Sequence, residues 1–238
     1  MIKYSIIIPA KNEGKYLPRT LDSIKMQNLG DLEIIVALSP ETKDNTREIA
    51  SAYGCRIVEG GLPAEARNNG AKASFGDTFI FIDSDSVMPE NFLSKAIQEF
   101  NEKDLDVAGT LQYPISTKKG FVKLRHEIYI NFFTNYFMKL AENTKKPFMQ
   151  TCMFAKRKVH EAVKFNETLE FGEDSDYAKR ARGAGFNFGL LKDTLPIGFS
   201  MRRFEENEVK TLAKNVYFIL GKAFGHEFIK GRSRIKYF

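Results

Sequence analysis

The sequence predicts an α/β fold with a mainly parallel central sheet that helices cover on both faces. Short β-branched runs alternate with amphipathic segments, and strands that alternate with helices of about ten to fifteen residues are typical of parallel sheets. The chain has 238 residues and 43% apolar content, which is enough to bury one sizeable core. We therefore expect residues 1–238 to form a single domain.

The first half of the chain repeats a unit of strand and helix. A β-branched run at 4–8 ends at Pro9, and the segment 14–28 carries apolar residues at helical spacing. The elements expected next are a strand at 33–38, a helix from a cap at Asp44 to about Tyr53, a strand at 56–58, a helix at 64–74, a strand at 78–82, a helix at 90–101 and a strand at 107–112. Because ligands bind outside the carboxyl ends of parallel strands, the loops that follow these strands are expected to hold the functional groups.

The regular alternation of strands and helices ends after residue 112. Residues 118–141 form a long, aromatic-rich amphipathic segment. The later elements expected are a strand at 150–155, helices at 173–183 and 205–225, and a basic tail with Lys230, Arg232, Arg234 and Lys236. No internal repeat or linker separates the two halves, so the second half is expected to complete the same domain.

Charge and composition narrow the classes of partner. The net charge of +6 and the isoelectric point near 9.1 suit a diphosphate, an acidic membrane or nucleic acid. No stretch approaches the roughly 20 apolar residues of a spanning helix, and the first residues do not resemble a signal peptide. Cys55 and Cys152 stand in no ligand spacing, which indicates neither a disulfide framework nor a zinc site. We expect a cytoplasmic protein, at most peripheral on the inner face of the membrane.

Two carboxylates follow the apolar run FIFI at 79–82. Asp83 and Asp85 stand at the end of this expected buried strand, where they can offer oxygen ligands to a hard divalent cation. Such a cation would bridge phosphates and stabilise the negative charge on a leaving nucleoside diphosphate. A capped turn is the alternative interpretation of so short a motif, but the position after a buried strand favours the metal site.

Three further charged residues are candidates from their chemistry. Arg67 carries a planar guanidinium that matches phosphate oxygens, although a solvated helix arginine is equally consistent with the local sequence. Glu173 and Asp174 open an expected helix, and acids are favoured there by the macrodipole and by capping alone. The residues by themselves leave both roles open.

Four segments, taken in order, resemble the family 2 inverting glycosyltransferases of the GT-A fold. They are SIIIPAKNE, the loop ending in KDNT after the second strand, EARNNGAKASFGDTFIFIDSD and FGEDSDYAKRARGAGF, and together they cover about residues 3–190. The resemblance implies that residues 1–112 bind a nucleotide sugar and that residues 113–238 lie on the acceptor side. It also implies a metal-dependent transfer that inverts the anomeric centre.

The resemblance assigns roles to particular residues. It implies a metal site for Mn²⁺ or Mg²⁺ at Asp85 and Asp83, with Asp174 as the catalytic base and Glu173 beside it. Contacts with the sugar donor are implied for Pro9, Ala10, Asn12, Glu13, Arg67, Asn68 and Asp83.

The chain departs from the family pattern at two places. The loop after the second strand reads ALSPETKDNT, so Ser39 and Pro40 stand where relatives carry aspartates. Ser39, Glu41 and Asp44 are the possible substitutes, Ser39 being the candidate for donor binding, and the choice between UDP and GDP stays open. The segment PIGFSMRRF at 196–204 lacks a histidine that completes the metal site in some relatives. Its Arg202 and Arg203 resemble the basic segment that closes over the diphosphate, and a surface basic pair is the alternative.

The function expected is therefore transfer of a sugar from a UDP- or GDP-sugar to a glycan or lipid-linked acceptor. A nucleotidyltransferase is a second interpretation, but PAKNEGKYLP after the first strand is not a glycine-rich phosphate loop. A nucleic-acid-binding module is a third, and the basic residues are spread along the chain and not gathered, so no nucleic acid partner is expected. The segment 118–141 with its basic start would also suit an anionic lipid surface, the alternative being that it packs on the sheet.

Overall fold

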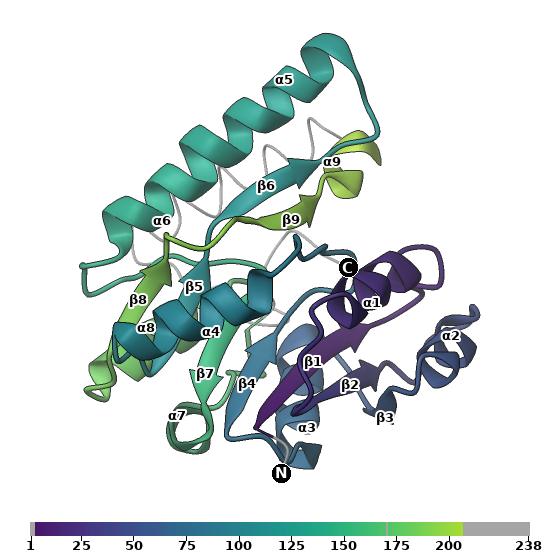
Figure 1. Ribbon diagram of the computed structural model, residues 1–238, viewed down its shortest axis with the longest axis horizontal. Helices are drawn as coiled ribbons and strands as arrows, with labels where there is room; N and C mark the ends of the chain where they lie inside the picture. The colour runs from purple at the N-terminus through teal and green to yellow at the C-terminus, as the bar shows by residue number, and fades with distance from the viewer. Residues whose placement is uncertain (1–2, 170, 207–238) are drawn as a thin grey trace.

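The computed structural model describes residues 3–169 and 171–206, apart from the side chains of Arg203 and Glu206. Its central feature is a seven-stranded sheet of order β3-β2-β1-β4-β7-β5-β8 (Figure 1). The strands are β1 (Tyr4–Ala10), β2 (Leu32–Leu38), β3 (Arg56–Glu59), β4 (Thr78–Phe81), β5 (Val107–Thr110), β7 (Met153–Lys156) and β8 (Phe188–Leu191). Only β7 runs antiparallel to its neighbours in this sheet, which confirms the mainly parallel sheet.

Helices cover both faces of the sheet because side chains alternate along each strand. On β1, Ile6 and Ile8 pack into one core, whereas Ile7 packs into the other. The first core takes its helical residues from α1 (Leu17–Lys25), α2 (Thr46–Ala52) and α4 (Phe92–Glu102). The second takes them from α3 (Pro63–Ala73), α6 (Tyr136–Ala141), α7 (Arg157–Val163) and α8 (Glu173–Gly183). The expected α/β architecture with helices on both faces is therefore confirmed.

The strand expected at 107–112 is wrong in one respect, because the chain divides it between two sheets. It ends as β5 at Thr110, and β6 (Gln112–Ile115) then pairs in parallel with β9 (Ile197–Ser200). Asn135 helps to divert the chain, since its amide accepts from the Gln112 N–H at 3.0 Å and donates to the Gln112 carbonyl at 2.7 Å. The strands β8 and β9 and the helix α7 were not expected from the sequence.

The small sheet is tied to the loop that follows β4. Val87 and Gly198 exchange two main-chain hydrogen bonds of 3.0 and 2.8 Å. A short helix, α9 (Arg202–Glu206), follows β9. The aspartates after β4 and the start of α9 are therefore held at neighbouring positions, although they are far apart in the sequence. The helix expected at 205–225 beyond Glu206 and the basic tail lie outside the described residues.

The expected amphipathic segment is a continuous helix that contacts β6 (Figure 1). It consists of α5 (Gly120–Ile128), a π-helical stretch η1 (Tyr129–Asn135) and α6 (Tyr136–Ala141). Across the described part of the chain, the helices are all too short or too polar to cross a membrane.

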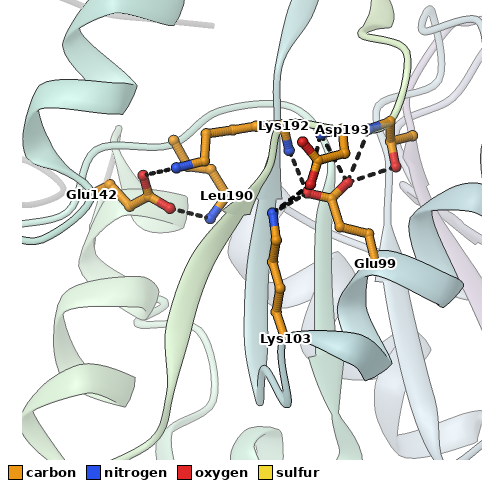
Figure 2. A network of polar contacts seen from close by, with 7 residues as sticks. Glu99, Lys103, Glu142, Leu190, Lys192 and Asp193 are labelled. Carbon is orange, nitrogen blue, oxygen red and sulfur yellow. Dashed lines mark hydrogen bonds and ion pairs between the residues drawn. The ribbon is translucent and has the colours of Figure 1, made fainter.

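A buried carboxylate fixes the turn between β8 and β9. Glu99 on α4 accepts hydrogen bonds from the main-chain N–H groups of Lys192, Asp193 and Thr194 at 2.7 to 3.1 Å (Figure 2). Although burial alone would raise the pKa of Glu99, hydrogen bonds from Lys103 and from this turn lower it to about 2. Next to it, Glu142 accepts from the Leu190 N–H and from Lys192 (Figure 2). The turn leads directly into β9, and its hydrogen bonds therefore help to fix the position of Arg202, which follows β9.

We expect Glu99→Gln to lower the free energy of unfolding by about 1–3 kcal/mol, the usual cost of removing a charged acceptor from buried donors. Since the folded pKa lies below the ordinary value of 4.5, this stabilisation is complete above pH 4.5 and is lost as the pH falls toward 2. Urea unfolding of both proteins at several pH values measures it. The control is Glu102→Gln on the same helix, where the carboxylate is exposed and accepts a hydrogen bond from Gln98. Equal losses in the two variants would contradict this role for Glu99.

Candidate active site

The carboxyl ends of β1, β2 and β4 open into a cavity of about 840 Å³. Most residues expected at the site line it, namely Pro9, Ala10, Asn12, Glu13, Ser39, Arg67, Asp83, Asp85, Glu173, Asp174 and Arg202. The side chain of Arg203 lies outside the described part of the structure. The sheet thus brings together residues from the β1, β2 and β4 loops, the start of α8 and the start of α9.

Asn68 does not line the cavity. Its amide donates to the Phe165 carbonyl at 3.0 Å and to Glu167 at 2.7 Å, and its carbonyl oxygen accepts from the Phe165 N–H at 2.9 Å. In this structure Asn68 therefore holds the loop after α7 against α3, which is a different task from the contact with the sugar donor that the resemblance implies.

The loops after β1 and β2 are bonded to each other. The Ser39 N–H donates to the Ala10 carbonyl at 2.9 Å, and Asn12, which has a positive φ of 55°, accepts from the Lys43 N–H at 2.7 Å. Asp44 accepts from the Gly14 N–H at 2.9 Å and from the Thr46 N–H at 3.1 Å. These hydrogen bonds hold the ALSPETKDNT loop against the β1 loop at the edge of the cavity. The Asp44 carboxylate is occupied by main-chain N–H groups.

Arg67 lies at the centre of the acidic part of the site. Its side chain is 3% exposed, and its guanidinium contacts Glu173 at 2.7 Å, Asp83 at 3.0 Å and Asp174 at 3.6 Å. Burial would lower the pKa of Arg67, but the three carboxylates raise it, so the group stays charged. One buried cation therefore joins the loop after β4 to the start of α8.

The close packing of α3 on β1 brings Arg67 to this position. A Cβ atom on Gly70 would lie 2.4 Å from Cγ2 of Ile7, a separation that only glycine allows without a shift of the helix. Phe165 packs on the guanidinium, with its ring centroid 5.4 Å from Cζ of Arg67. The residue expected as a phosphate ligand is thus held by packing on one side and by carboxylates on the other.

Asp174 lies in an environment that favours its neutral form. Burial, together with the nearby charges of Glu173 and Asp83, raises the pKa of Asp174 to about 7, although Arg67 and the Thr151 N–H act in the opposite direction. A carboxyl group with a pKa near neutrality can take a proton from a substrate and release it again at physiological pH. The raised pKa of Asp174 and its position at the cavity make it a candidate for an acid–base group.

A second arginine, Arg202, pairs with Glu13 and Asp85. Arg202 donates to both carboxylate oxygens of Glu13 at 2.8 and 2.6 Å, and its Nε lies 2.8 Å from Oδ2 of Asp85. Its Cζ also lies 4.3 Å from the ring centroid of Tyr16. The sequence named Arg202 as a candidate, but its bidentate pairing with Glu13 depends on the unexpected strand β9.

The two aspartates after β4 fit a divalent cation. Carboxylates are ligands for Mg²⁺, which commonly binds through one or two of them together with phosphate oxygens and water. Among the described residues, no group of three or more His, Cys, Asp or Glu side chains could enclose an ion. An ion held by Asp83 and Asp85 would need further ligands, such as phosphate oxygens and water.

An aromatic wall, defined here as Tyr129, Phe171, Phe199 and Phe204, also lines the cavity. These four aromatic residues were not expected at the site from the sequence. No local signal could have found them, since they come from η1, the segment before α8, β9 and α9. The cavity thus has a polar side near β1 and β2 and an aromatic side near β6 and β9.

Sequence comparison finds similar proteins that are named as glycosyltransferases. The glycosyltransferase GlyG of Streptococcus pneumoniae serotype 4 is 33% identical over 112 residues, 43% of this chain and 36% of that protein. The uncharacterised glycosyltransferase EpsJ of Bacillus subtilis is 32% identical over 123 residues, 48% and 35% of the two chains. The matched region spans about a third of the length of these relatives.

Solved structures of similar fold include two complexes with nucleotide sugars. S. aureus TarS 1–349 in complex with UDP-GlcNAc has a TM-score of 0.66 at 19% identity, over 83% of this chain and 58% of that one. The mannosyltransferase PcManGT from Pyrobaculum calidifontis in complex with GDP-Man and Mn²⁺ has a TM-score of 0.64 at 19% identity, over 82% and 55%. At this identity the likeness confirms the expected GT-A fold. A family model described as glycosyl transferase family 2 matches residues 5–164, more than half of the chain, and the chain therefore belongs to glycosyl transferase family 2.

Proposed function

We propose that this chain is a metal-dependent, inverting glycosyltransferase of the hexosyltransferase type that moves a sugar from a UDP- or GDP-sugar to an acceptor hydroxyl or a lipid phosphate. The observation that carries the proposal is the position of Asp174, whose pKa is raised, in the same cavity as Asp83 and Asp85 and linked to Asp83 through Arg67. The complexes of TarS with UDP-GlcNAc and of PcManGT with GDP-Man and Mn²⁺ support this choice of sugar donor and metal.

The polar side of the cavity is the proposed site for the sugar donor. Pro9, Ala10, Asn12, Glu13 and Ser39 line it from the β1 and β2 loops, and these are the residues proposed to flank the nucleoside. Its diphosphate would lie toward Asp83, Asp85 and Arg202. A Mn²⁺ or Mg²⁺ ion held by the two aspartates would neutralise the charge that develops on the leaving nucleoside diphosphate.

Asp174 is the proposed general base. Its carboxylate removes the proton from the acceptor hydroxyl while that oxygen forms a bond to the anomeric carbon, and the bond from that carbon to the diphosphate oxygen breaks on the opposite face. Attack opposite the leaving group inverts the anomeric centre. A phosphate acceptor, which is ionised at neutral pH, would not need a base.

Arg67 is proposed to control the charge of Asp174. The guanidinium lies 3.6 Å from Oδ1 of Asp174 and favours the ionised form, while burial and the neighbouring acids favour the neutral form. Since the opposing effects leave the pKa near 7, the base can be restored after each turnover. Glu173, which accepts from Arg67 at 2.7 Å, is proposed to hold the guanidinium in place, and Arg203 remains a candidate beside Arg202 for the diphosphate.

The whole chain is proposed to act as one catalytic domain at the cytoplasmic side, with the sugar donor bound by residues 1–112 and the acceptor by residues 113–238. Membership of glycosyl transferase family 2 favours sugar transfer over nucleotidyl transfer. It also favours an enzyme over a nucleic-acid-binding module, and no nucleic acid partner is proposed.

We expect Asp85→Asn to abolish sugar transfer in Mg²⁺ or Mn²⁺ and to reduce the rise in melting temperature that UDP or GDP with Mn²⁺ produces. The reason is that an amide replaces a charged metal ligand, and the stabilisation that a ligand gives the native state falls with the logarithm of its affinity. Asp77→Asn is the matched control, because Asp77 is an exposed aspartate before the other end of β4. A folded Asp85→Asn protein with unchanged transfer would rule out the metal assignment.

We expect Asp174→Asn to lower kcat by about two to four orders of magnitude with a nearly unchanged KM for the sugar donor, as for loss of a general base. Steady-state kinetics with a hydroxyl acceptor measures this, and NMR of the product reports the anomeric configuration. Asp176→Asn is the control, since Asp176 lies on the same helix and pairs with Arg180 at 2.7 Å. A product of retained configuration would refute the inverting mechanism, and a larger effect at Asp176 would transfer the role of base.

A further inference from the structure

One helix carries most of the exposed apolar side chains of the described chain. Apart from Met26, Phe75 and Leu195, all the large apolar side chains that are exposed there lie on α5–η1–α6. We call the apolar face the set Phe121, Leu124, Ile128, Phe132, Tyr136 and Leu140, whose exposed fractions run from 44% to 72%. Phe133 and Phe137 widen it. Contiguous exposure on this scale marks a surface that meets a partner.

The apolar face is separate from the face that packs on the protein. A second row, also spaced by four residues, is buried and consists of His126, Ile130, Thr134 and Met138. In an α-helix of 3.6 residues per turn, a spacing of four would rotate each row by about 40° per step. The π-helical stretch Tyr129–Asn135 has more residues per turn and offsets this rotation. The helix therefore satisfies its core contacts with one row and leaves the other exposed.

Basic residues surround the apolar face. Lys118 and Lys119 precede it and Lys145 and Lys146 follow it, and all four are exposed. Between residues 118 and 141 the charged side chains are Lys118, Lys119, Lys123, Arg125, Glu127 and Lys139, so five are basic and one is acidic. Aromatic and aliphatic side chains rimmed by lysines are complementary to an anionic lipid surface, where apolar groups enter the acyl boundary and lysines meet the headgroups.

The apolar face is continuous with the aromatic wall of the cavity. Phe133 stacks on Tyr129 with ring centroids 6.0 Å apart, and Tyr129 contacts Phe204 at 4.7 Å. Both Tyr129 and Phe204 line the cavity that contains Asp174. The helix runs alongside β6 (Figure 1), on the side of the cavity away from the β1 and β2 loops. A surface that touched the apolar face would thus reach the acceptor side of the site.

We propose that the apolar face docks in the plane of an anionic lipid bilayer and that the acceptor is a lipid-linked molecule in that bilayer. The docking rests on exposure and charge alone, whereas the identity of the acceptor also rests on the proposed glycosyl transfer. The acceptor would then reach Asp174 from the bilayer, past Tyr129 and Phe204, and not from solution.

Flotation with phosphatidylcholine vesicles, with or without phosphatidylglycerol, tests the docking. The protein is expected to float with the anionic vesicles at low salt, and the double variant Phe132→Ser/Leu140→Ser to bind at least about tenfold more weakly, since apolar burial drives insertion. The control is Met26→Ser/Phe75→Ser, which removes apolar side chains of similar exposure, 68% and 67%, outside the apolar face. Lys118→Gln/Lys119→Gln/Lys145→Gln/Lys146→Gln is expected to remove the preference for phosphatidylglycerol.

Melting temperature, with and without UDP or GDP and Mn²⁺, shows that each variant is folded and binds nucleotide. Failure of the wild-type protein to float at low salt would overturn the docking, as would equal binding by the two serine variants. A dimer in light scattering that only Phe132→Ser/Leu140→Ser dissociates would assign the apolar face to a second copy instead. Flotation without any nucleotide effect would overturn the proposed transferase function and leave the docking intact.

Discussion

The site depends on one buried cation. Arg67 is almost completely enclosed and contacts carboxylates that come from two distant stretches of the chain. A buried guanidinium without partners is strongly unfavourable, and a buried carboxylate equally so, which means that each group requires the others to be present. The loop after β4 and the start of α8 are therefore held at a fixed separation by charge. The proposed base Asp174 and the proposed metal ligand Asp83 are held close together because both contact Arg67.

Arg202 repeats this arrangement with two other acids that line the cavity. It joins Glu13 from the β1 loop to Asp85 from the β4 loop, and the exchange of bonds between Val87 and Gly198 holds its segment in register. Acids and guanidinium groups thus alternate around the site. The proposed diphosphate and its cation would add an anion and a cation to this arrangement of acids and guanidinium groups.

Local sequence predicts the first half of the fold well and the second half only in part. Runs such as SIIIP and FIFI are β-branched or aromatic and end at polar loops, so β1, β4 and the carboxylates after β4 follow from pattern alone. The strands β8 and β9 are four residues each, FGLL and IGFS, and they are strands because β5 and β6 lie beside them. The neighbouring sequence does not predict the break between β5 and β6 at Leu111, nor the turn that Glu99 holds. The same limit applies at the site, where Asn68 faces Phe165 and Glu13 pairs with a residue of the last described helix.

The order of strands has a consequence for how the chain folds during synthesis. β5 belongs to the first half, yet its partners in the sheet are β7 and β8 from the second half. β5 ends at Thr110 and β7 begins at Met153, so β5 emerges from the ribosome well before either strand that can pair with it. Until then β4 and β5 expose unpaired edges, and such long-range pairing is slow to form and open to aggregation. Residues 1–112 therefore do not contain the sheet partners of β5, and the sheet is complete only when β7 and β8 have been made.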